Sequence, residues 1–319
     1  MRNFTSKLAP VIKEYLEHRS MLGYSDFHER SLGMFDAYCR EHRPDMETIT
    51  RDLVREWIDF ETSRGFTGMY NRVPAIRLLA QYMGNGAYIL PPKSLPPPKP
   101  CKPYILSDEE LSRLFTAADN IGGNFDDSVK LMFPTLLRLQ YTCGLRPYEV
   151  RLIERKNINL ITGEILITKT KKHRERIVVM SDDTLEQCRK YDAVRTVFAP
   201  NSEYFFVRYD NTPISSLKLW LVFNRCWQQA NADVPVNMLP RVRPYDLRHR
   251  YASAILQKWL DDGKDLYAML PYLQAYMGHE NFSHTAYYIH LLPENLLNSA
   301  GVDWSAIDAV NPEVNVWEN

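Results

Sequence analysis

The sequence has few cysteines, no long apolar run and no net charge. Its five cysteines are odd in number, and the closest two, Cys188 and Cys226, lie 38 positions apart (226 − 188). This spacing argues against a zinc cluster or a disulfide framework. No apolar stretch approaches the roughly 18 residues of a membrane-spanning helix, and the first residues lack the apolar block of a signal peptide. We therefore expect a cytoplasmic protein without a membrane segment.

The lack of net charge bears on the possible partners. The chain has 39 basic and 39 acidic residues, whereas contacts with many phosphates need a basic surface. The basic residues are nevertheless clustered. Residues 169–176, KTKKHRER, hold five lysines and arginines, and a second group comprises Arg241, Arg243, Arg248 and Arg250. A neutral total is thus compatible with a local basic groove.

Proline divides the chain. Residues 91–100, PPKSLPPPKP, do not suit a helix and predict a stiff, extended spacer. Because this run lies between two long segments, an interdomain linker is favoured over a proline-rich ligand for a recognition domain. We predict an N-terminal domain at residues 1–90, the linker at 91–103, a second domain at 104–290 and a C-terminal tail at 291–319.

The N-terminal domain has the periodicity of a small helical bundle. Apolar residues recur at helical spacing in four segments, at residues 8–16, 28–39, 50–60 and 67–82. Thr50 is placed to cap the third helix. Arg72 and Arg77 fall outside the apolar stripe of the fourth, which leaves them for solvent, the usual environment of a charged helix face, or for phosphate.

The second domain mixes helices with strands. Residues 107–110 match a capping box, and residues 131–141 predict an apolar helix that ends before Gly144. Strands are predicted at residues 158–167 and 176–180, with the basic run at the tip of the hairpin between them. We therefore predict a mainly α protein with a small β-hairpin or sheet in its C-terminal domain.

Residues 243–290 carry the strongest chemical signal. RPYDLRHRYAS begins a predicted helix with Arg248 and His249 in its first turn, and MGHENFSHTAYYIH places His279 after a predicted helix end, shortly before a tyrosine pair. Arginine matches two phosphate oxygens, histidine moves a proton near neutral pH, and a phenol can attack phosphorus. Taken singly, these residues have ordinary interpretations as helix caps, helix ends or core tyrosines. The combination favours chemistry on a phosphodiester.

Together these segments resemble the C-terminal signature of the tyrosine recombinases, the phage integrase family. That family carries His-x-x-Arg-His, then Leu-Gly-His, then a nucleophilic Tyr nine residues after the last His, which selects Tyr288 (279 + 9) over Tyr287. Two positions depart from the pattern. Tyr245 stands in place of the first His, and a phenol with a pKa of about 10 donates to phosphate but is a poor base. Met277 replaces Leu with little change in volume.

The family's first box and its hairpin lysine are also represented. GLRPYE resembles that box, which implies that Arg146 grips the phosphate and that Glu149 orients it. In the family a lysine on the β-hairpin protonates the leaving 5′ oxygen. Counting back from the second strand favours Lys171, whereas the Thr-Lys-Thr context favours Lys169. We assign Lys171 and leave the register open.

The resemblance implies a site-specific recombinase or integrase of a mobile element, which cleaves and rejoins DNA through a 3′-phosphotyrosine. The predicted catalytic residues are Arg146, Lys171, Arg248, His249, His279 and Tyr288. The predicted DNA-binding residues are Arg72, Arg77, Lys169, Lys172, Arg174 and Tyr245. His249 would act as the proton acceptor or as a hydrogen-bond donor to the phosphate, and His279 would hydrogen-bond the phosphate.

The resemblance also implies a helical core-binding, SAM-like N-terminal domain and a catalytic second domain that needs no metal or cofactor. Its partner would be a double-stranded DNA recombination site, bound by a homotetramer assembled from monomers through a tail that docks in trans. Three other functions stay open. A type IB topoisomerase uses nearly the same residues, a decayed recombinase would only bind DNA, and a helical interaction protein would do neither.

Overall fold

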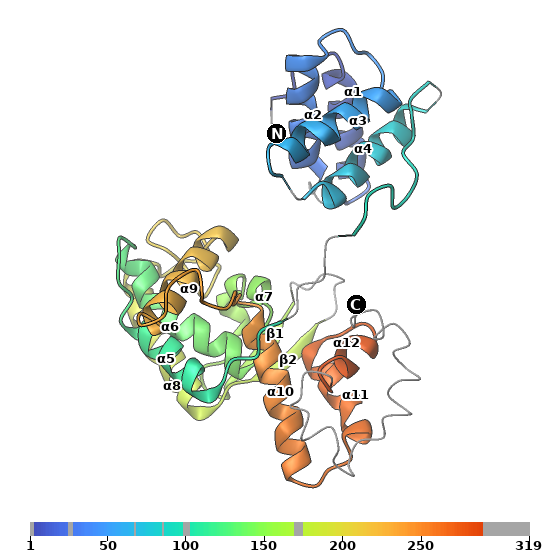
Figure 1. Ribbon diagram of the computed structural model, residues 1–319. Helices are drawn as coiled ribbons and strands as arrows, with labels where there is room; N and C mark the ends of the chain where they lie inside the picture. Colours follow the sequence, from blue (N-terminus) through green and yellow to red (C-terminus); the bar gives the residue numbers. More distant parts are fainter. Residues whose placement is uncertain are drawn as a thin grey trace. The chain divides into compact units, whose positions relative to one another are not determined.

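The computed structural model of the protein describes residues 3–24, 28–66, 68–84, 86–97, 103–168 and 175–289. It divides into two units, Met1–Cys101 and Lys102–Asn319, and each unit contains its own hydrophobic clusters (Figure 1). The described residues form helices and one antiparallel pair of strands, which confirms the predicted fold class. None of the helices in these ranges combines the length and apolarity needed to cross a membrane.

The described part of the N-terminal unit is a bundle of four helices. They are α1 (Ala9–Met21), α2 (Glu29–His42), α3 (Arg51–Ser63) and α4 (Met69–Met83). Thr50 caps α3 as predicted, because its side chain accepts a hydrogen bond from the Leu53 amide. Apolar faces of the four helices form one core, in which the fully buried Trp57 meets Phe35 edge-on at 5.1 Å between ring centroids.

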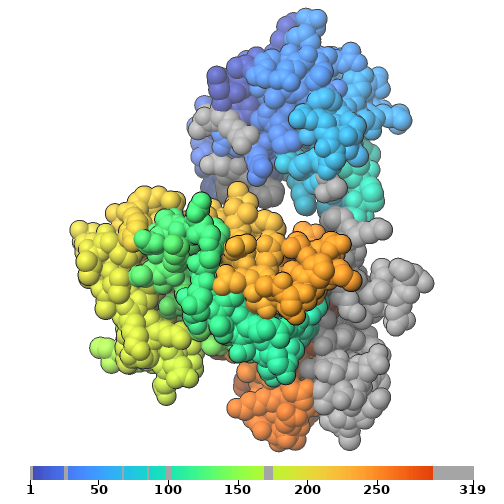
Figure 2. Space-filling view, turned by 60° about the vertical axis from the view of Figure 1, so that its left-hand side comes forward, coloured from blue at the N-terminus to red at the C-terminus, as the bar shows by residue number. Residues whose placement is uncertain are grey.

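The C-terminal unit contains the remaining elements. Its helices are α5 (Asp108–Asp119), α6 (Asp127–Thr142), α7 (Pro147–Arg151), the 3-10 turn η2 (Arg155–Asn157), α8 (Asp182–Phe198), α9 (Ser216–Ala230), α10 (Asp246–Asp261), α11 (Leu266–Met277) and α12 (Ser283–Ala286). The predicted capping box at Ser107 and Glu110 is present at the start of α5. Segments far apart in sequence, from green α5 and α6 to orange α10, form one continuous surface in Figure 2.

The strands are β1 (Glu164–Ile167) and β2 (Arg176–Val179), paired antiparallel with Ile167 opposite Arg176. The first strand is shorter than predicted. Residues 159–163 form a turn in which the Gly163 amide donates to the Asn159 carbonyl, and only an isolated bridge joins Ile158 to Ile165. The tip of the hairpin, with Lys169, Lys171, Lys172 and Arg174, lies outside the described residues.

Three helices of the C-terminal unit bring together its distant motifs. The apolar helix α6 packs against α10, and α10 in turn packs against α11. Helix α6 ends at Thr142, just before Gly144, whose φ is +58°. Helix α11 ends as predicted at Gly278, which adopts the left-handed conformation with φ 62° and ψ 46°. These ends aim backbone carbonyls toward the start of α10.

Candidate active site

The first part of the site is built at the start of α7. Pro147 occupies its first turn, so Arg146 is held in an extended conformation just before the helix. The Glu149 carboxylate reaches back to accept from the Arg146 amide at 2.9 Å and from Arg146 Nη1 at 2.7 Å. Arg146 Nη2 donates to the Gly278 carbonyl at 2.8 Å. The Arg146 side chain stays 28% exposed, so its guanidinium is fixed and still open to a ligand.

Arg248, in the first turn of α10, is fully buried. Its Nη1 donates to the Gly144 carbonyl at 2.7 Å, and its Nη2 donates to the Met277 carbonyl and to His279 Nε2. Its Nη1 also lies 3.9 Å from Glu149 Oε2, so both predicted arginines converge on one carboxylate. Its Nε is buried without a hydrogen-bond partner among the described residues. Burial lowers the Arg248 pKa, but a guanidinium stays charged in proteins.

The hydrogen bonds of His279 fix its tautomer. A guanidinium only donates, so Nε2 accepts from Arg248 at 3.0 Å, and the ring proton lies on Nδ1. Nδ1 is 2.8 Å from Thr285 Oγ1, to which it donates. Burial, followed by the Arg248 charge, lowers the His279 pKa to about 2, so the ring is neutral. In this tautomer, Nε2 is an acceptor and Nδ1 carries the ring proton.

Tyr288 is the second residue after the short helix α12 and lies beside both histidines. Its ring centroid is 5.5 Å from that of His249 and 5.7 Å from that of His279. Burial raises the Tyr288 pKa to about 12 and lowers the His249 pKa to about 4. His249 Nδ1 is buried without a hydrogen-bond partner in the described structure. A protonated phenol therefore lies beside a neutral imidazole.

Tyr245 completes this group at the N-terminal end of α10. Its ring centroid is 5.1 Å from that of His249, and the side chain is exposed at the position where the family pattern has histidine. Its hydroxyl is the kind of group that donates to a phosphate without accepting its charge. Tyr287, the neighbour of Tyr288, is only partly buried.

Arg176, at the start of β2, was not predicted as a site residue. Its Nη1 and Nη2 donate to the two oxygens of Glu149 at 2.9 and 2.8 Å. Burial by itself would raise the Glu149 pKa, but Arg176 and Arg146 outweigh it and hold the pKa at about 2. The sequence shows only that Arg176 begins a predicted strand. No neighbouring residue in the sequence indicates that its partner is Glu149.

The remaining predicted residues lie elsewhere. Arg72 and Arg77 belong to α4 in the N-terminal unit, where Arg72 lies 3.9 Å above the Phe66 ring and Arg77 Nε donates to the Leu90 carbonyl. The predicted lysines and Arg174 fall in the range 169–174, which is not described. In the described ranges, no group of three or more His, Cys, Asp or Glu side chains is arranged to hold a metal ion.

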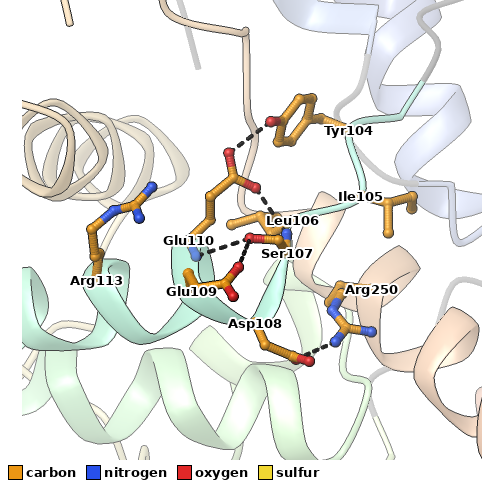
Figure 3. A pocket seen from close by; sticks show the side chains of 9 residues that line it. All are labelled: Tyr104, Ile105, Leu106, Ser107, Asp108, Glu109, Glu110, Arg113 and Arg250. Carbon is orange, nitrogen blue, oxygen red and sulfur yellow. Dashed lines mark hydrogen bonds and ion pairs between the residues drawn. The ribbon is translucent and has the colours of Figure 1, made fainter.

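A separate hollow lies where α5 begins. It has a volume of about 900 Å³ and is lined by residues 104–110, Arg113 and Arg250. Figure 3 shows Tyr104 donating to Glu110 and Arg250 paired with Asp108. The polar groups of this hollow largely satisfy one another, and none of the predicted site residues lines it. The predicted residues Arg146 and Arg248 lie instead around Glu149.

The cluster can bind and activate one anionic group. The guanidinium groups of Arg146 and Arg248 both contact the Glu149 carboxylate. Their remaining N–H groups are suited to donate to nonbridging phosphate oxygens. Tyr288 supplies a nucleophilic oxygen and His249 a neutral base beside it. Charge stabilisation, a nucleophile and a proton acceptor are thus gathered in one place.

The sequence is similar to proteins of a known family. The model of the phage integrase family matches residues 105–295. The protein named "Putative integrase/recombinase y4rE", from Sinorhizobium fredii, is 27% identical over 304 residues, which cover 91% of this chain and 93% of that protein. Tyrosine recombinase XerD of Staphylococcus aureus is 26% identical over 276 residues, 83% of this chain and 86% of that protein.

Two solved structures share the fold. The XerH site-specific recombinase bound to its palindromic difH substrate, in a post-cleavage complex, aligns with a TM-score of 0.60 and 19% identity over 87% of this chain and 79% of that chain. The Tn1549 transposon integrase in complex with transposon right end DNA aligns with a TM-score of 0.62 and 12% identity over 98% of this chain and 100% of that chain.

Proposed function

The chain belongs to the phage integrase family of tyrosine recombinases, and on this premise we propose that it cleaves and rejoins a specific DNA site through a 3′-phosphotyrosyl intermediate. As a member of that family it is a DNA strand-transferase. The observation that carries the mechanism is the convergence of Arg146 and Arg248 on Glu149, with His279 in contact both with Arg248 and with the ring of Tyr288. Arg146 and Arg248 lie 102 positions apart in the sequence (248 − 146), and Tyr288 follows Arg248 by 40 positions (288 − 248).

The two arginines are suited to hold the scissile phosphate. An arginine has five N–H donors, and Arg248 uses three of them on Gly144, Met277 and His279. Its buried Nε has no partner among the described residues, and an unpaired buried donor costs about 1–3 kcal/mol. A phosphate oxygen at this position would remove that cost. The more exposed Arg146 would take a second oxygen, so negative charge that develops at phosphorus is stabilised from two sides.

The chemical step then exchanges one phosphoester for another. The Tyr288 oxygen attacks phosphorus, the bond from phosphorus to the 5′ oxygen breaks, and a bond from phosphorus to the tyrosyl oxygen forms. Because burial holds the Tyr288 pKa at about 12, the phenolic proton must leave during attack, and His249 accepts it. We assign Lys171 to protonate the departing 5′ oxygen, with Lys169 and Lys172 as DNA contacts. The ester keeps the bond energy for rejoining.

The remaining roles follow from the family. We propose that Tyr245 donates to the phosphate, that Arg174 contacts the DNA backbone, and that Arg72 and Arg77 do so from the N-terminal unit. The protein would act in the cytoplasm as a homotetramer on DNA, with residues 291–319 docking in trans. The Tn1549 integrase was solved with transposon DNA, and a role in moving a genetic element is the corresponding proposal here.

The test is covalent trapping of DNA. Duplexes recovered from a random library by binding to the wild-type protein are resynthesised with a nick beside each candidate scissile phosphate, so that the cleaved end diffuses away and the adduct accumulates. We expect an adduct with the wild type and with Tyr287→Phe, and none with Tyr288→Phe. Tyr287 is the matched control because it is the neighbouring tyrosine.

Each other outcome identifies a different function. Specific binding by the wild type without an adduct would indicate a decayed recombinase that only binds DNA. Adducts on unrelated duplexes, together with relaxation of supercoiled DNA, would indicate a type IB topoisomerase. The absence of any DNA binding would leave an interaction protein. An adduct formed by Tyr288→Phe would refute the nucleophile.

A further inference from the structure

Arg176 connects three parts of the candidate site. It begins β2, and its side chain is only 9% exposed. Its Nη1 and Nη2 donate to both oxygens of Glu149, and its Nε donates to the Tyr276 carbonyl at 2.9 Å. A single guanidinium thus joins the strand that leaves the lysine-bearing hairpin tip to the start of α7 and the end of α11.

The same guanidinium packs against the turn that ends α11. A Cβ atom added at Gly278 would lie 3.2 Å from Arg176 Nη1 and 3.3 Å from its Cδ. This turn supplies the Gly278 carbonyl to Arg146 and the Met277 carbonyl to Arg248. Arg176 therefore contacts the backbone that holds both phosphate-binding arginines.

Glu149 depends on Arg176 for its position and its charge. Its side chain is 1% exposed, and it accepts from Arg146 as well as from Arg176. A bidentate pair fixes a carboxylate in orientation as well as in position. Without it, Glu149 would be held by Arg146 and by the more distant Arg248 Nη1 at 3.9 Å, and the negative charge would bias the Arg146 guanidinium away from an incoming phosphate.

We propose, on the basis of the function proposed above, that Arg176 is a positioning residue for DNA cleavage. It has no role in contacting the phosphate, because each of its three nitrogens already donates to Glu149 or to the Tyr276 carbonyl, whereas Arg248 Nε has no partner among the described residues. It acts by locking Glu149 and the turn at Gly278, so that Arg146 and Arg248 are already in place when DNA binds.

The test measures single-turnover cleavage at saturating nicked DNA, DNA affinity and unfolding free energy for full-length variants. Arg176→Lys keeps the charge and loses the planar fork. We expect its cleavage rate to fall by about 10- to 100-fold, the usual effect of small misplacement in an active site, with unchanged DNA affinity. When Arg176→Lys is combined with Glu149→Gln, the cleavage rate should fall much less than it does when Arg176→Lys is made in the wild type. The effects of residues that act as a unit are not additive.

The matched control is Arg155→Lys. Arg155 makes a similar bidentate pair in the same unit, with Nε and Nη2 on the two oxygens of Asp192 at 3.0 and 2.8 Å and Nη1 on the Ile158 carbonyl. It should lose comparable stability and keep the wild-type cleavage rate. Arg176→Gln serves as the second variant if Arg176→Lys does not fold, with the same loss expected.

The outcomes separate this inference from the function on which it rests. If the wild type traps no DNA, the proposed function fails. If the wild type traps DNA but Arg176→Lys cleaves at the wild-type rate, the positioning role is refuted alone. Equal loss in Arg155→Lys, or additive losses with Glu149→Gln, would equally refute it by showing a merely structural effect.

Discussion

Burial and ion pairing set the charges of the titratable groups in the candidate site. Burial raises the Tyr288 pKa to about 12 and lowers those of His249 and His279 to about 4 and about 2. For Glu149 the paired guanidinium groups prevail over burial and the pKa is about 2. At neutral pH the site therefore holds a protonated phenol, two neutral imidazoles and a carboxylate. This distribution suits a site that awaits an anionic phosphate.

These shifts predict how stability depends on pH. An unfolded histidine takes up a proton below about pH 6.5, whereas His249 and His279 stay neutral in the fold. Their contribution is complete above pH 6.5 and is lost as the pH falls, toward 4 for His249 and toward 2 for His279, on the order of 1–2 kcal/mol for each at pH 5. Glu149 adds a further loss from pH 4.5 toward 2. Urea unfolding at pH 8, 6.5 and 5 measures this, and a constant free energy of unfolding would contradict it.

Thr285 supports the tautomer of His279 that Arg248 imposes, which leads to a second prediction. Thr285→Val removes the hydroxyl that accepts from Nδ1 at 2.8 Å. The proton is then free to move to Nε2, which would stop accepting from Arg248. We expect DNA cleavage to slow by about tenfold, equivalent to the roughly 1–2 kcal/mol of a lost hydrogen bond.

Thr285→Ser is the control for this change, because it keeps the hydroxyl and should cleave at nearly the wild-type rate. Nitrogen chemical shifts of the His279 ring report the tautomer directly. A valine variant with unchanged ring shifts and unchanged cleavage would show that Thr285 has no such role.

At the scale of elements, the site is made where helices begin and end. Carbonyls at the ends of α6 and α11 are free of helical partners, and those of Gly144, Met277 and Gly278 accept from Arg248 and Arg146. The same property of helix termini that usually requires a cap is used here to orient guanidinium groups. Each arginine is therefore held by backbone whose position depends on helix packing.

A substitution at Gly144 tests whether the position of Arg248 depends on this backbone. Its φ is +58°, and an added Cβ would lie 2.5 Å from Tyr251 Cδ1 and 3.2 Å from Met277 Sδ. Gly144→Ala should lower the free energy of unfolding by about 2–4 kcal/mol through backbone strain and overpacking. Because the Gly144 carbonyl holds Arg248, cleavage by the remaining folded protein should fall as well.

Gly263 provides the comparison. Its φ is +67°, but an added Cβ would meet nothing within 4 Å. Gly263→Ala should cost about 1 kcal/mol from the positive φ alone and leave the cleavage rate of the folded protein unchanged. Thermal unfolding of both variants measures the cost of backbone strain and overpacking. Single-turnover cleavage by both variants measures the effect of displacing Arg248. Equal cleavage by the two variants would argue against the role of the Gly144 carbonyl.

At the scale of the whole molecule, the two units have separate hydrophobic clusters. Trp57 is fully buried in the N-terminal cluster and Phe133 in the larger C-terminal one. Trp57→Ala should destabilise the N-terminal unit by about 3–5 kcal/mol and leave amide exchange in α6 unchanged. Phe133→Ala should destabilise the C-terminal unit and leave amide exchange in the N-terminal helices unchanged. Hydrogen exchange resolved by peptide measures both, and joint loss of protection would show that the units unfold together.

Local patterns predicted most of the helical elements and their caps. Thr50, Ser107 and Gly278 mark helix ends through their own side chains or backbone freedom, so their roles follow from neighbours in sequence. Helix α8 was not predicted, because its apolar positions do not form a clear stripe between charged residues. The first strand was predicted too long because the turn before Gly163 is also apolar.

The sequence by itself determined the family of the protein and the residue types that its chemistry requires, because these are written in short motifs whose spacing is read directly. Only the tertiary structure decided how those residues are held. Arg176 meets Glu149 and the Tyr276 carbonyl across 27 and 100 positions, and Arg248 fixes the tautomer of His279. Such contacts depend on the packing of α6, α10 and α11, and the hydrogen bonds of a buried charge are set by whatever the fold brings beside it.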